Sequence, residues 1–154
     1  KYKSLNDSAD MIGKASFYLK AVNSLDGSDV RISKRANVPY NRLRGFEKGK
    51  VGPKDNTDYI GGNYVSTLNL STNLPSILRS VESLDFSYFI DVANIWGVDY
   101  DSTINDSKKI RSATGIALEY LSPVGPLTFS FTQPITKHSS DKTETFRFNL
   151  GTTF

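Results

Sequence analysis

The fold of this chain is decided by IRSATGIALEYLSPVGPLTFSFTQP, residues 110–134, in which two patterned runs flank a short turn. Apolar side chains alternate with small or polar ones along residues 110–121 and again along residues 127–134. A period of two is typical of a β-strand that has one face against an apolar environment. The intervening SPVGP, residues 122–126, has room only for a tight turn. The stretch therefore predicts two long antiparallel strands joined as a hairpin.

The same alternation recurs along the chain, whereas helical periodicity is hard to find. The other alternating stretches are ASFYLKA (15–21), YVSTLNLSTNL (64–74), LDFSYFIDVANIW (84–96) and TETFRFNLGTTF (143–154). Together with the hairpin they predict six strands of roughly 10 to 13 residues each. The first residues, KYKSLND, look like the remnant of one further strand.

The length of these strands and the character of their second face favour a membrane barrel. A strand of about 9 to 11 residues crosses a bilayer at a tilt, whereas strands of soluble sheets usually have about five or six. The face opposite the apolar side chains carries Gly, Ala, Ser, Thr, Asn, Asp, Glu and Arg, and we expect no apolar set in the interior. Such a face suits a water-filled lumen. We therefore predict an all-β, antiparallel transmembrane β-barrel segment; the alternative is a soluble β-sandwich or lipocalin-like barrel.

The composition excludes further classes of site. Cysteine is absent, which rules out disulfides and thiolate chemistry. The net charge is only +3 and the basic residues are scattered, which argues against nucleic-acid binding. No apolar run approaches the roughly eighteen residues that a membrane-spanning helix needs. The chain does not begin with Met, and we expect it to be a fragment whose targeting segment lies upstream.

Connections of unequal length join the predicted strands. A long connection at about residues 25–61 and a polar one at 97–109 contrast with the tight turn at 122–126. Outer-membrane barrels have long extracellular loops and short periplasmic turns. On this parity the long connection is extracellular, and Phe154 ends in the periplasm.

Within the long connection, LRGFEKGKVGPKD (43–55) carries more charges and glycines than a plain turn requires. Three interpretations compete: a phosphate-binding loop, an exposed surface loop, and a loop that folds into a defined place. The phosphate-binding loop is rejected because Gly45 and Gly49 are too close together, and because Val51 stands where Ser or Thr would hold magnesium.

No catalytic, metal or cofactor site is predicted, and we do not expect an enzyme. His138 is the only histidine, and it lies in a polar loop with nothing to orient it for a Ser/His/Asp triad. Asp99, Asp101 and Asp106 could bind calcium weakly, but they lack the glycine turn and terminal glutamate of an EF-hand.

LRGF at residues 43–46 resembles the VRGF/IRGF signature of the BamA/TamA superfamily of outer-membrane insertases and transporters. The resemblance continues in order from about residue 11 to residue 154. It is carried by VGPKD (51–55), IGGN (60–63), FIDVANIW (89–96), IRSATGIALEYLSPVGPLTFSFTQPI (110–135) and DKTETFRFNLGTTF (141–154). It implies that residues 1–154 form the C-terminal part of an outer-membrane barrel of about 16 strands, without its N-terminal strands and its periplasmic POTRA domains. The GGN and SPVGPL stretches are most similar to the branch that inserts other proteins.

The resemblance also implies that the signature loop folds back into the lumen, where its arginine meets acidic and aromatic groups. The signature residues are Leu43, Arg44, Gly45 and Phe46. Asp91 has the parity of an inward residue, which suggests an Arg44–Asp91 pair in which the planar guanidinium matches the carboxylate. Gly45 permits a sharp turn, and Phe46 can wedge against the wall. Where the family usually has a second inward carboxylate this sequence has Asn69, so Arg44 would depend more on Asp91 or on another partner.

The last strand resembles the C-terminal signal by which outer-membrane proteins are recognised for assembly. The residues concerned are Phe146, Phe148, Leu150, Gly151 and Phe154. The simpler alternative is that the aromatic residues face lipid, with Phe154 in the interfacial girdle. In the family this strand pairs weakly with the first strand and forms a lateral gate, whose free edge can template an incoming strand. Gly151 would help to keep that seam loose.

The function implied by the resemblance is the folding and insertion of β-barrel proteins into the bacterial outer membrane, without covalent chemistry or a cofactor. The implied partners are nascent outer-membrane β-barrel proteins, accessory lipoproteins bound through the POTRA domains, and the lipid bilayer. The alternatives are a TamA-like or two-partner-secretion transporter and, more remotely, a passive porin or a soluble β-sheet binding module.

Overall fold

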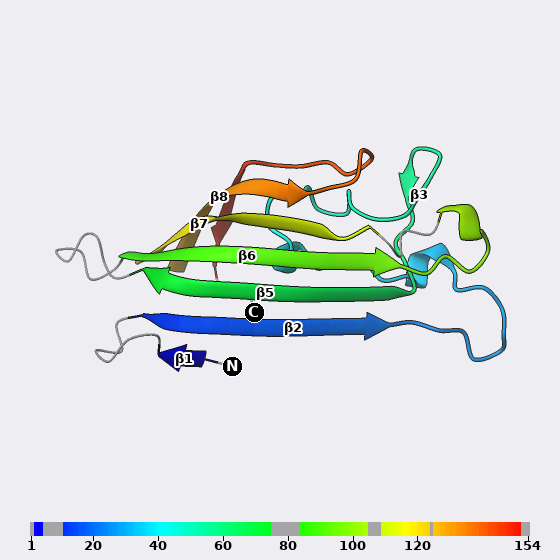
Figure 1. Cartoon of the computed structure of the whole chain (residues 1–154), viewed down its shortest axis with the longest axis horizontal. Coiled ribbons are helices and arrows are strands. Elements are labelled where there is room, and N and C mark those ends of the chain that lie inside the picture. The colour runs from blue at the N-terminus through cyan, green and yellow to red at the C-terminus, as the bar shows by residue number, and fades with distance from the viewer. Residues whose placement is uncertain (1, 5–10, 75–83, 105–108, 124, 152–154) are drawn as a thin grey trace.

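The computed structural model describes residues 2–4, 11–74, 84–104, 109–123 and 125–151. Its main element is a seven-stranded antiparallel sheet in the order β1-β2-β5-β6-β7-β8-β9 (Figure 1). The strands are β1 (Tyr2–Ser4), β2 (Ile12–Ala21), β5 (Tyr64–Leu74), β6 (Leu84–Trp96), β7 (Arg111–Ser122), β8 (Gly125–Thr136) and β9 (Phe146–Leu150). The connections hold a small hairpin of β3 (Lys54–Asp55) and β4 (Asp58–Tyr59), and the 3-10 turns η1 (Ile32–Lys34), η2 (Tyr40–Arg42) and η3 (Ser102–Ile104). No helix in the described ranges is long and apolar enough to cross a membrane.

The hairpin predicted from residues 110–134 is present as β7 and β8, with Ser122 paired to Gly125 at the turn. The other predicted strands correspond to β2, β5, β6 and β9, and the predicted remnant corresponds to β1, which pairs with β2. The predicted strand length is confirmed for β2, β5, β6, β7 and β8, which have 10 to 13 residues. The antiparallel all-β prediction is therefore confirmed, and within the described residues the sheet is open rather than closed into a barrel.

The last strand is shorter than predicted: β9 has only five residues, within the alternating stretch TETFRFNLGTTF. The reason lies in the hydrogen bonds at its start. The Thr132 amide of β8 still donates to the Thr145 carbonyl at 2.8 Å, but the Glu144 amide donates to the Gly45 carbonyl of the long connection at 3.1 Å. The segment before β9 therefore pairs with the loop instead of with β8.

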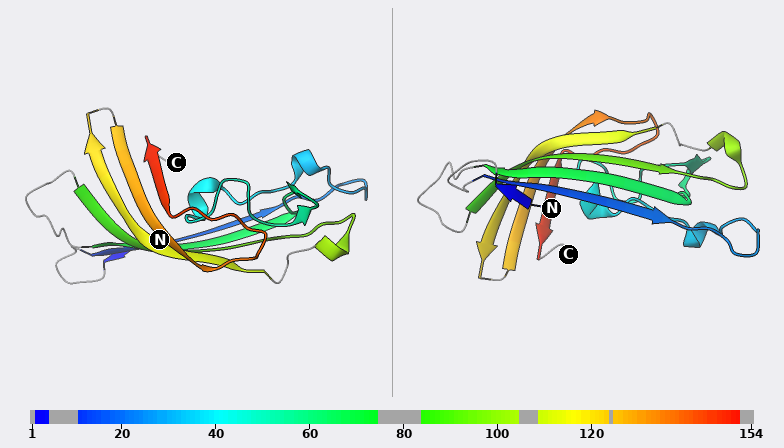
Figure 2. Two further views of the ribbon diagram at one scale, coloured as in Figure 1. Left: turned by 90° about the horizontal axis from the view of Figure 1, so that it is seen from above. Right: turned by 60° about the horizontal axis from the view of Figure 1, so that its bottom comes forward.

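The sheet is curved, and the connection between β2 and β5 lies on its concave side (Figure 2). The convex face carries a band of exposed apolar side chains. They include Phe17, Leu68, Leu70, Tyr88, Ile116, Phe131, Phe146 and Phe148. Directly paired residues share a face of a sheet, and the register pairs Phe17 with Leu68 and Ile116 with Phe131. The band thus crosses several strands, as expected of a surface that contacts lipid.

The concave face carries a buried apolar set, so the expectation of an interior without one was wrong. Val65 and Ile95 have no exposed surface, and they form one cluster with Leu43, Phe46 and Val51 of the long connection. The reason is that the loop covers this part of the wall and excludes water from it, so apolar side chains are stabilised there.

The remainder of the concave face is polar. It borders a cavity of about 280 Å³ whose lining is entirely polar or charged. The lining includes Lys14, Ser16, Asn69, Ser71, Ser87 and Glu119. The inner wall is thus divided into a dry area under the loop and a wet area beside it, and only the wet area matches the lumen predicted from the sequence.

If the convex face contacts lipid, single cysteines on the two faces will differ in reactivity. The chain contains no cysteine, so Ile116→Cys on the convex face and Ser71→Cys in the wet area can be compared in a cysteine-free full-length protein in bilayers. We expect a membrane-impermeant maleimide to label Ser71→Cys and not Ile116→Cys, because lipid excludes the reagent. Equal labelling of both positions would contradict this orientation.

Candidate functional site

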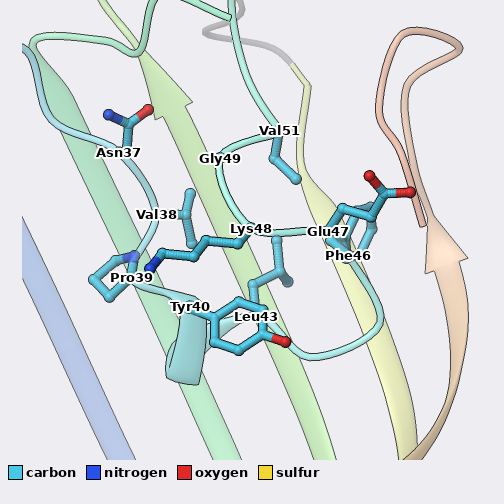
Figure 3. A pocket seen from close by; sticks show the side chains of 10 residues that line it. All are labelled: Asn37, Val38, Pro39, Tyr40, Leu43, Phe46, Glu47, Lys48, Gly49 and Val51. Carbon is cyan, nitrogen blue, oxygen red and sulfur yellow. The ribbon is translucent and has the colours of Figure 1, made fainter. Parts of the chain in front are cut away.

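The candidate site is the in-folded loop, defined here as residues 36–52, together with the wall of the sheet that it contacts. Figure 3 shows the segment from Asn37 to Val51 crossing the strands. Leu43 and Phe46 are 3% and 1% exposed, and the crevice that these side chains border within the loop has a volume of about 10 Å³, room for about one water. The loop is therefore a packed element rather than a solvated connector, which excludes the exposed surface loop.

The Arg44–Asp91 contact suggested by the sequence is present. The Nε and Nη2 atoms of Arg44 donate to Oδ2 and Oδ1 of Asp91 at 2.7 and 2.8 Å, and the Arg44 backbone amide donates to Oδ2 at 3.1 Å. The Asp91 side chain has no exposed surface. A buried carboxylate is costly unless its oxygens are hydrogen-bonded, and the planar guanidinium supplies two of the bonds in a single fork.

The position of the guanidinium is also fixed by an aromatic ring. The Cζ atom of Arg44 lies 3.3 Å from the centroid of the Phe89 ring, within the range of a cation–π interaction. Phe89 itself is fully buried. Sequence reasoning did not name Phe89, although its position two residues before Asp91 gives it the same inward parity.

Asn69 was considered as a partner of the Arg44 guanidinium, but its partners in the structure are Asp91 and the Arg42 carbonyl. Its Nδ2 atom donates to Asp91 Oδ1 at 2.8 Å and to the Arg42 carbonyl at 2.7 Å, rather than contacting the Arg44 guanidinium. The register explains this, because Asn69 lies directly opposite Asp91 in the β5–β6 ladder. A carboxylate at this position would face Asp91 as a like charge, whereas an amide supplies Asp91 with one more donor.

Gly45 occupies a position that few other residues could take, and Phe46 beside it is buried. Gly45 has φ +87°, and a Cβ atom there would lie 2.6 Å from the Thr132 Cγ2 atom of β8. The loop backbone therefore approaches the wall too closely for a side chain. Phe46 forms an isolated β-bridge with Thr143, and its buried side chain packs in the apolar cluster of the dry area.

A second buried ion pair, which sequence reasoning missed, holds the end of the loop. Arg111 of β7 and Asp141 have fully buried side chains, with Nε–Oδ2 and Nη2–Oδ1 distances of 2.9 and 3.1 Å. Asp141 also accepts hydrogen bonds from the backbone amides of His138 at 2.7 Å and Gly52 at 3.4 Å. The signal available in the sequence was the inward parity of Arg111, without any indication of its partner.

A third ion pair joins Arg35 to Asp99, outside the sheet. The pKa of Asp99 is lowered to about 2: burial acts to raise it, but hydrogen bonds from the Val30 amide and Asn63 Nδ2, together with the Arg35 charge, outweigh that effect. The pair therefore contributes its full stability above the unfolded pKa of about 4 and loses it as the pH falls toward 2.

The residues considered for catalysis or calcium binding form no site in the described residues. The His138 Nδ1 atom contacts Ser140 Oγ at 2.8 Å, and the Asp99 carboxylate is engaged by Arg35. Asp101 accepts hydrogen bonds from Thr103, and Asp106 lies outside the described residues. In the described ranges, no group of three or more His, Cys, Asp or Glu side chains is placed to hold a metal ion.

Of the residues of the predicted C-terminal signal, Phe146, Phe148 and Leu150 lie on the exposed face of β9. The rings of Phe146 and Phe148 lie 5.1 Å from those of Phe131 and Phe129 of β8, and Leu150 is 63% exposed. The Gly151 amide donates to the Pro126 carbonyl of β8 at 2.8 Å. The looser seam suggested for Gly151 is the one with the first strand, and it stays a prediction. Phe154 lies outside the described residues.

A curved antiparallel sheet with an apolar convex face, and a loop bonded to its concave face, defines a segment of a transmembrane β-barrel with an in-folded loop. The chain belongs to the Omp85 superfamily, since the Omp85 superfamily domain matches residues 1–154.

Individual relatives agree with this assignment. The chain is 28% identical over 139 residues to the outer membrane protein assembly factor BamA of Neisseria meningitidis serogroup B, covering 73% of this chain and 17% of that protein. It is 30% identical over 145 residues to the sorting assembly machinery 50 kDa subunit of Saccharomyces cerevisiae, covering 89% of this chain and 30% of that protein. The crystal structure of BamA from Haemophilus ducreyi lacking POTRA domains 1–3 matches with a TM-score of 0.85 and 29% identity, over 96% of this chain and 32% of that chain. The resemblance inferred from LRGF is confirmed, and the chain spans less than a third of each of these proteins.

The energetic link between Arg44 and Asp91 can be measured with a double-mutant cycle in the full barrel. We expect Arg44→Ala and Asp91→Asn each to lower the free energy of unfolding by about 2–4 kcal/mol, because each leaves a buried group without its partner. The double variant should be less destabilised than the sum of the two by about 1 kcal/mol or more. Chemical denaturation in detergent gives these values, and additive effects would show that the two residues act independently.

The close approach at Gly45 can be separated from backbone strain by comparing two glycines of the same loop. Gly49 also has a positive φ, +68°, but a Cβ atom there would meet nothing within 4 Å. We expect Gly45→Ala to destabilise the barrel by about 1–3 kcal/mol more than Gly49→Ala. Thr132→Ser removes the clashing Cγ2 atom, so it should restore part of the loss in Gly45→Ala. Equal effects of the two alanine variants would contradict the close approach.

Proposed function

We propose that the chain is the C-terminal part of the barrel of a BamA-like factor that folds and inserts β-barrel proteins into the bacterial outer membrane. The observation that carries the proposal is the LRGF loop, which is fixed to the inner wall by the bidentate hydrogen bonds from Arg44 to Asp91. Its support from relatives is the assembly function named for the Neisseria protein, together with the structural match to the Haemophilus BamA. The bacterial location in this proposal rests on these two bacterial relatives. The family alone does not fix it, because a yeast sorting assembly subunit is also similar to the chain.

The proposed mechanism uses strand pairing rather than covalent chemistry. β9 is bonded to β8 through five register positions in the described residues, against eleven between β7 and β8. With so short a ladder to β8, β9 can shift more readily than β7, so it is suited to be the movable side of a lateral gate whose seam is its other edge, toward the first strand of the barrel. An opened strand edge offers unpaired N–H and C=O groups to an incoming strand, which adds by β-augmentation.

The in-folded loop would support the wall while that seam opens. Its apolar cluster, the Arg44–Asp91 ion pair and the hydrogen bond from Arg147 join the loop to β5, β6, β7 and β9 independently of the ladder hydrogen bonds. The remaining elements of the proposal belong to the whole protein. They are upstream strands that complete the barrel, and POTRA domains that bind accessory lipoproteins and deliver nascent chains. No enzyme activity or cofactor is needed for this mechanism.

The proposal is tested by reconstituting the full-length protein into liposomes and following the folding of a small outer-membrane barrel by its protease resistance. We expect the wild-type protein to accelerate folding, and Arg44→Ala or Asp91→Asn to reduce that rate about tenfold, the equivalent of about 1.4 kcal/mol. Gly49→Ala, in an open part of the same loop, serves as the matched control and should retain the rate. If wild-type liposomes fold the test barrel no faster than empty ones, the proposed function is wrong.

A further inference from the structure

Arg147 lies in β9, the last strand of the chain, and its side chain is buried beneath the in-folded loop, which precedes it by about a hundred residues. Its side chain shares the concave face, since Arg147 lies opposite the buried Ser130 of β8, and it is only 4% exposed. Its Nη1 atom donates to the Tyr40 carbonyl at 2.6 Å, and its Nη2 atom donates to the Phe46 carbonyl at 2.8 Å. One guanidinium therefore binds the loop at two points, before the signature residues at Tyr40 and at the last of them, Phe46.

Two further contacts fix this guanidinium. Its Cζ atom lies 3.6 Å from the centroid of the Tyr40 ring, close enough for a stacked cation–π interaction. Glu144, three residues earlier in the chain, forms an ion pair with it. The charge of Arg147 is thus neutralised within its own strand segment, and its free donors are directed at the loop.

Backbone hydrogen bonds reinforce the same contact. The Glu47 amide donates to the Lys142 carbonyl at 3.0 Å, and the Lys142 amide donates to the Lys50 carbonyl at 3.1 Å. With the bond from the Glu144 amide to Gly45, these bonds form a short antiparallel ladder between the loop and the segment that leads into β9. The backbone of residues 142–144, which leads into β9, is therefore bonded to the loop, whereas its neighbours Asp141 and Thr145 are bonded to Arg111 of β7 and to Thr132 of β8.

The remaining attachment of β9 is to β8, through its five-position ladder and the ring pairs on the convex face. Moving β9 away from β8 while the loop stays in place would pull the guanidinium from two carbonyls and a ring that lie on the loop. Moving the loop while β9 stays in place would break the same bonds.

We infer that Arg147 is a positioning residue that clamps the last strand to the in-folded loop, so that the two move together. The clamp itself is independent of any activity. Its consequence for gating rests on the proposed function: if β9 is the movable side of the gate, the state of the loop sets how readily the gate opens. Because coupling between two sites is reciprocal, loosening either side must loosen the other.

The test is hydrogen exchange, followed by mass spectrometry, of the full-length protein in lipid nanodiscs. The variant is Arg147→Gln, which keeps a polar side chain but loses the charge and the fork. We expect exchange to become about tenfold faster or more in peptides that contain the Glu47 amide and in those that contain the Glu144 amide. Arg147→Lys should not rescue protection, since a point charge cannot bind two carbonyls and stack on the Tyr40 ring.

Asn149→Ser is the matched control, because Asn149 lies two residues from Arg147 on the same face of β9 and, in the described residues, makes no side-chain hydrogen bond to the loop. It should leave loop exchange unchanged. The inference is overturned if Arg147→Gln accelerates exchange only around β9 and leaves the loop protected, or if Asn149→Ser has the same effect on the loop.

Reciprocity gives a second arm that does not alter β9. Arg44→Ala loosens the loop from β6, and it should accelerate exchange of the Glu144 amide. Should Arg147→Gln fail to fold, Tyr40→Leu removes the stacked ring and the hydroxyl that hydrogen-bonds Glu144, leaves the Arg147 side chain in place, and should accelerate both segments to a smaller extent. A change confined to the loop would overturn the clamp. Exchange requires no client protein, so failure of the wild-type protein to accelerate folding of the test barrel in the same nanodiscs would refute the proposed function without bearing on the clamp.

Discussion

Asp91 is a carboxylate with no exposed surface in the wall of the sheet, and four N–H groups make that position tenable. Arg44 supplies three of them and Asn69 the fourth, so that each carboxylate oxygen accepts two hydrogen bonds. Three of these donors belong to the loop. If the loop withdrew, the carboxylate would lose all three of these donors and water would have to take their place. The charge in the wall therefore determines where the loop lies.

The loop in turn changes what the wall can be made of. Under it, Val65, Phe89 and Ile95 are fully buried, whereas the uncovered wall is lined by polar and charged residues. Arginines from three places then tie the assembly together: Arg44 reaches from the loop to β6, Arg111 joins β7 to Asp141, and Arg147 reaches from β9 to the loop. The loop is thus a brace across the concave face, bonded both to central strands and to the last one.

Local patterns predicted the strands, because a period of two depends only on neighbouring residues and on which side is apolar. Parity also placed Asp91 inward, and the LRGF signature directed Arg44 to it. The partner of Asn69 required the β5–β6 register, which alternation alone does not provide. The buried Val65 and Ile95, the shortened β9 and the Arg147 contacts all depend on a loop about a hundred residues away from β9 in the chain. No local pattern carries that information.

The central claim is that the Arg44 guanidinium is bound to Asp91 on the inner wall of the barrel. The most direct measurement is the solvent exchange rate of the Arg44 Nε–H proton, observed by NMR in the full-length protein in nanodiscs with labelled arginine. A proton that donates to a fully buried carboxylate at 2.7 Å should exchange far more slowly than that of a free arginine, and should lose its protection in Asp91→Asn. Exchange as fast as that of a free arginine in the wild-type protein would contradict the claim.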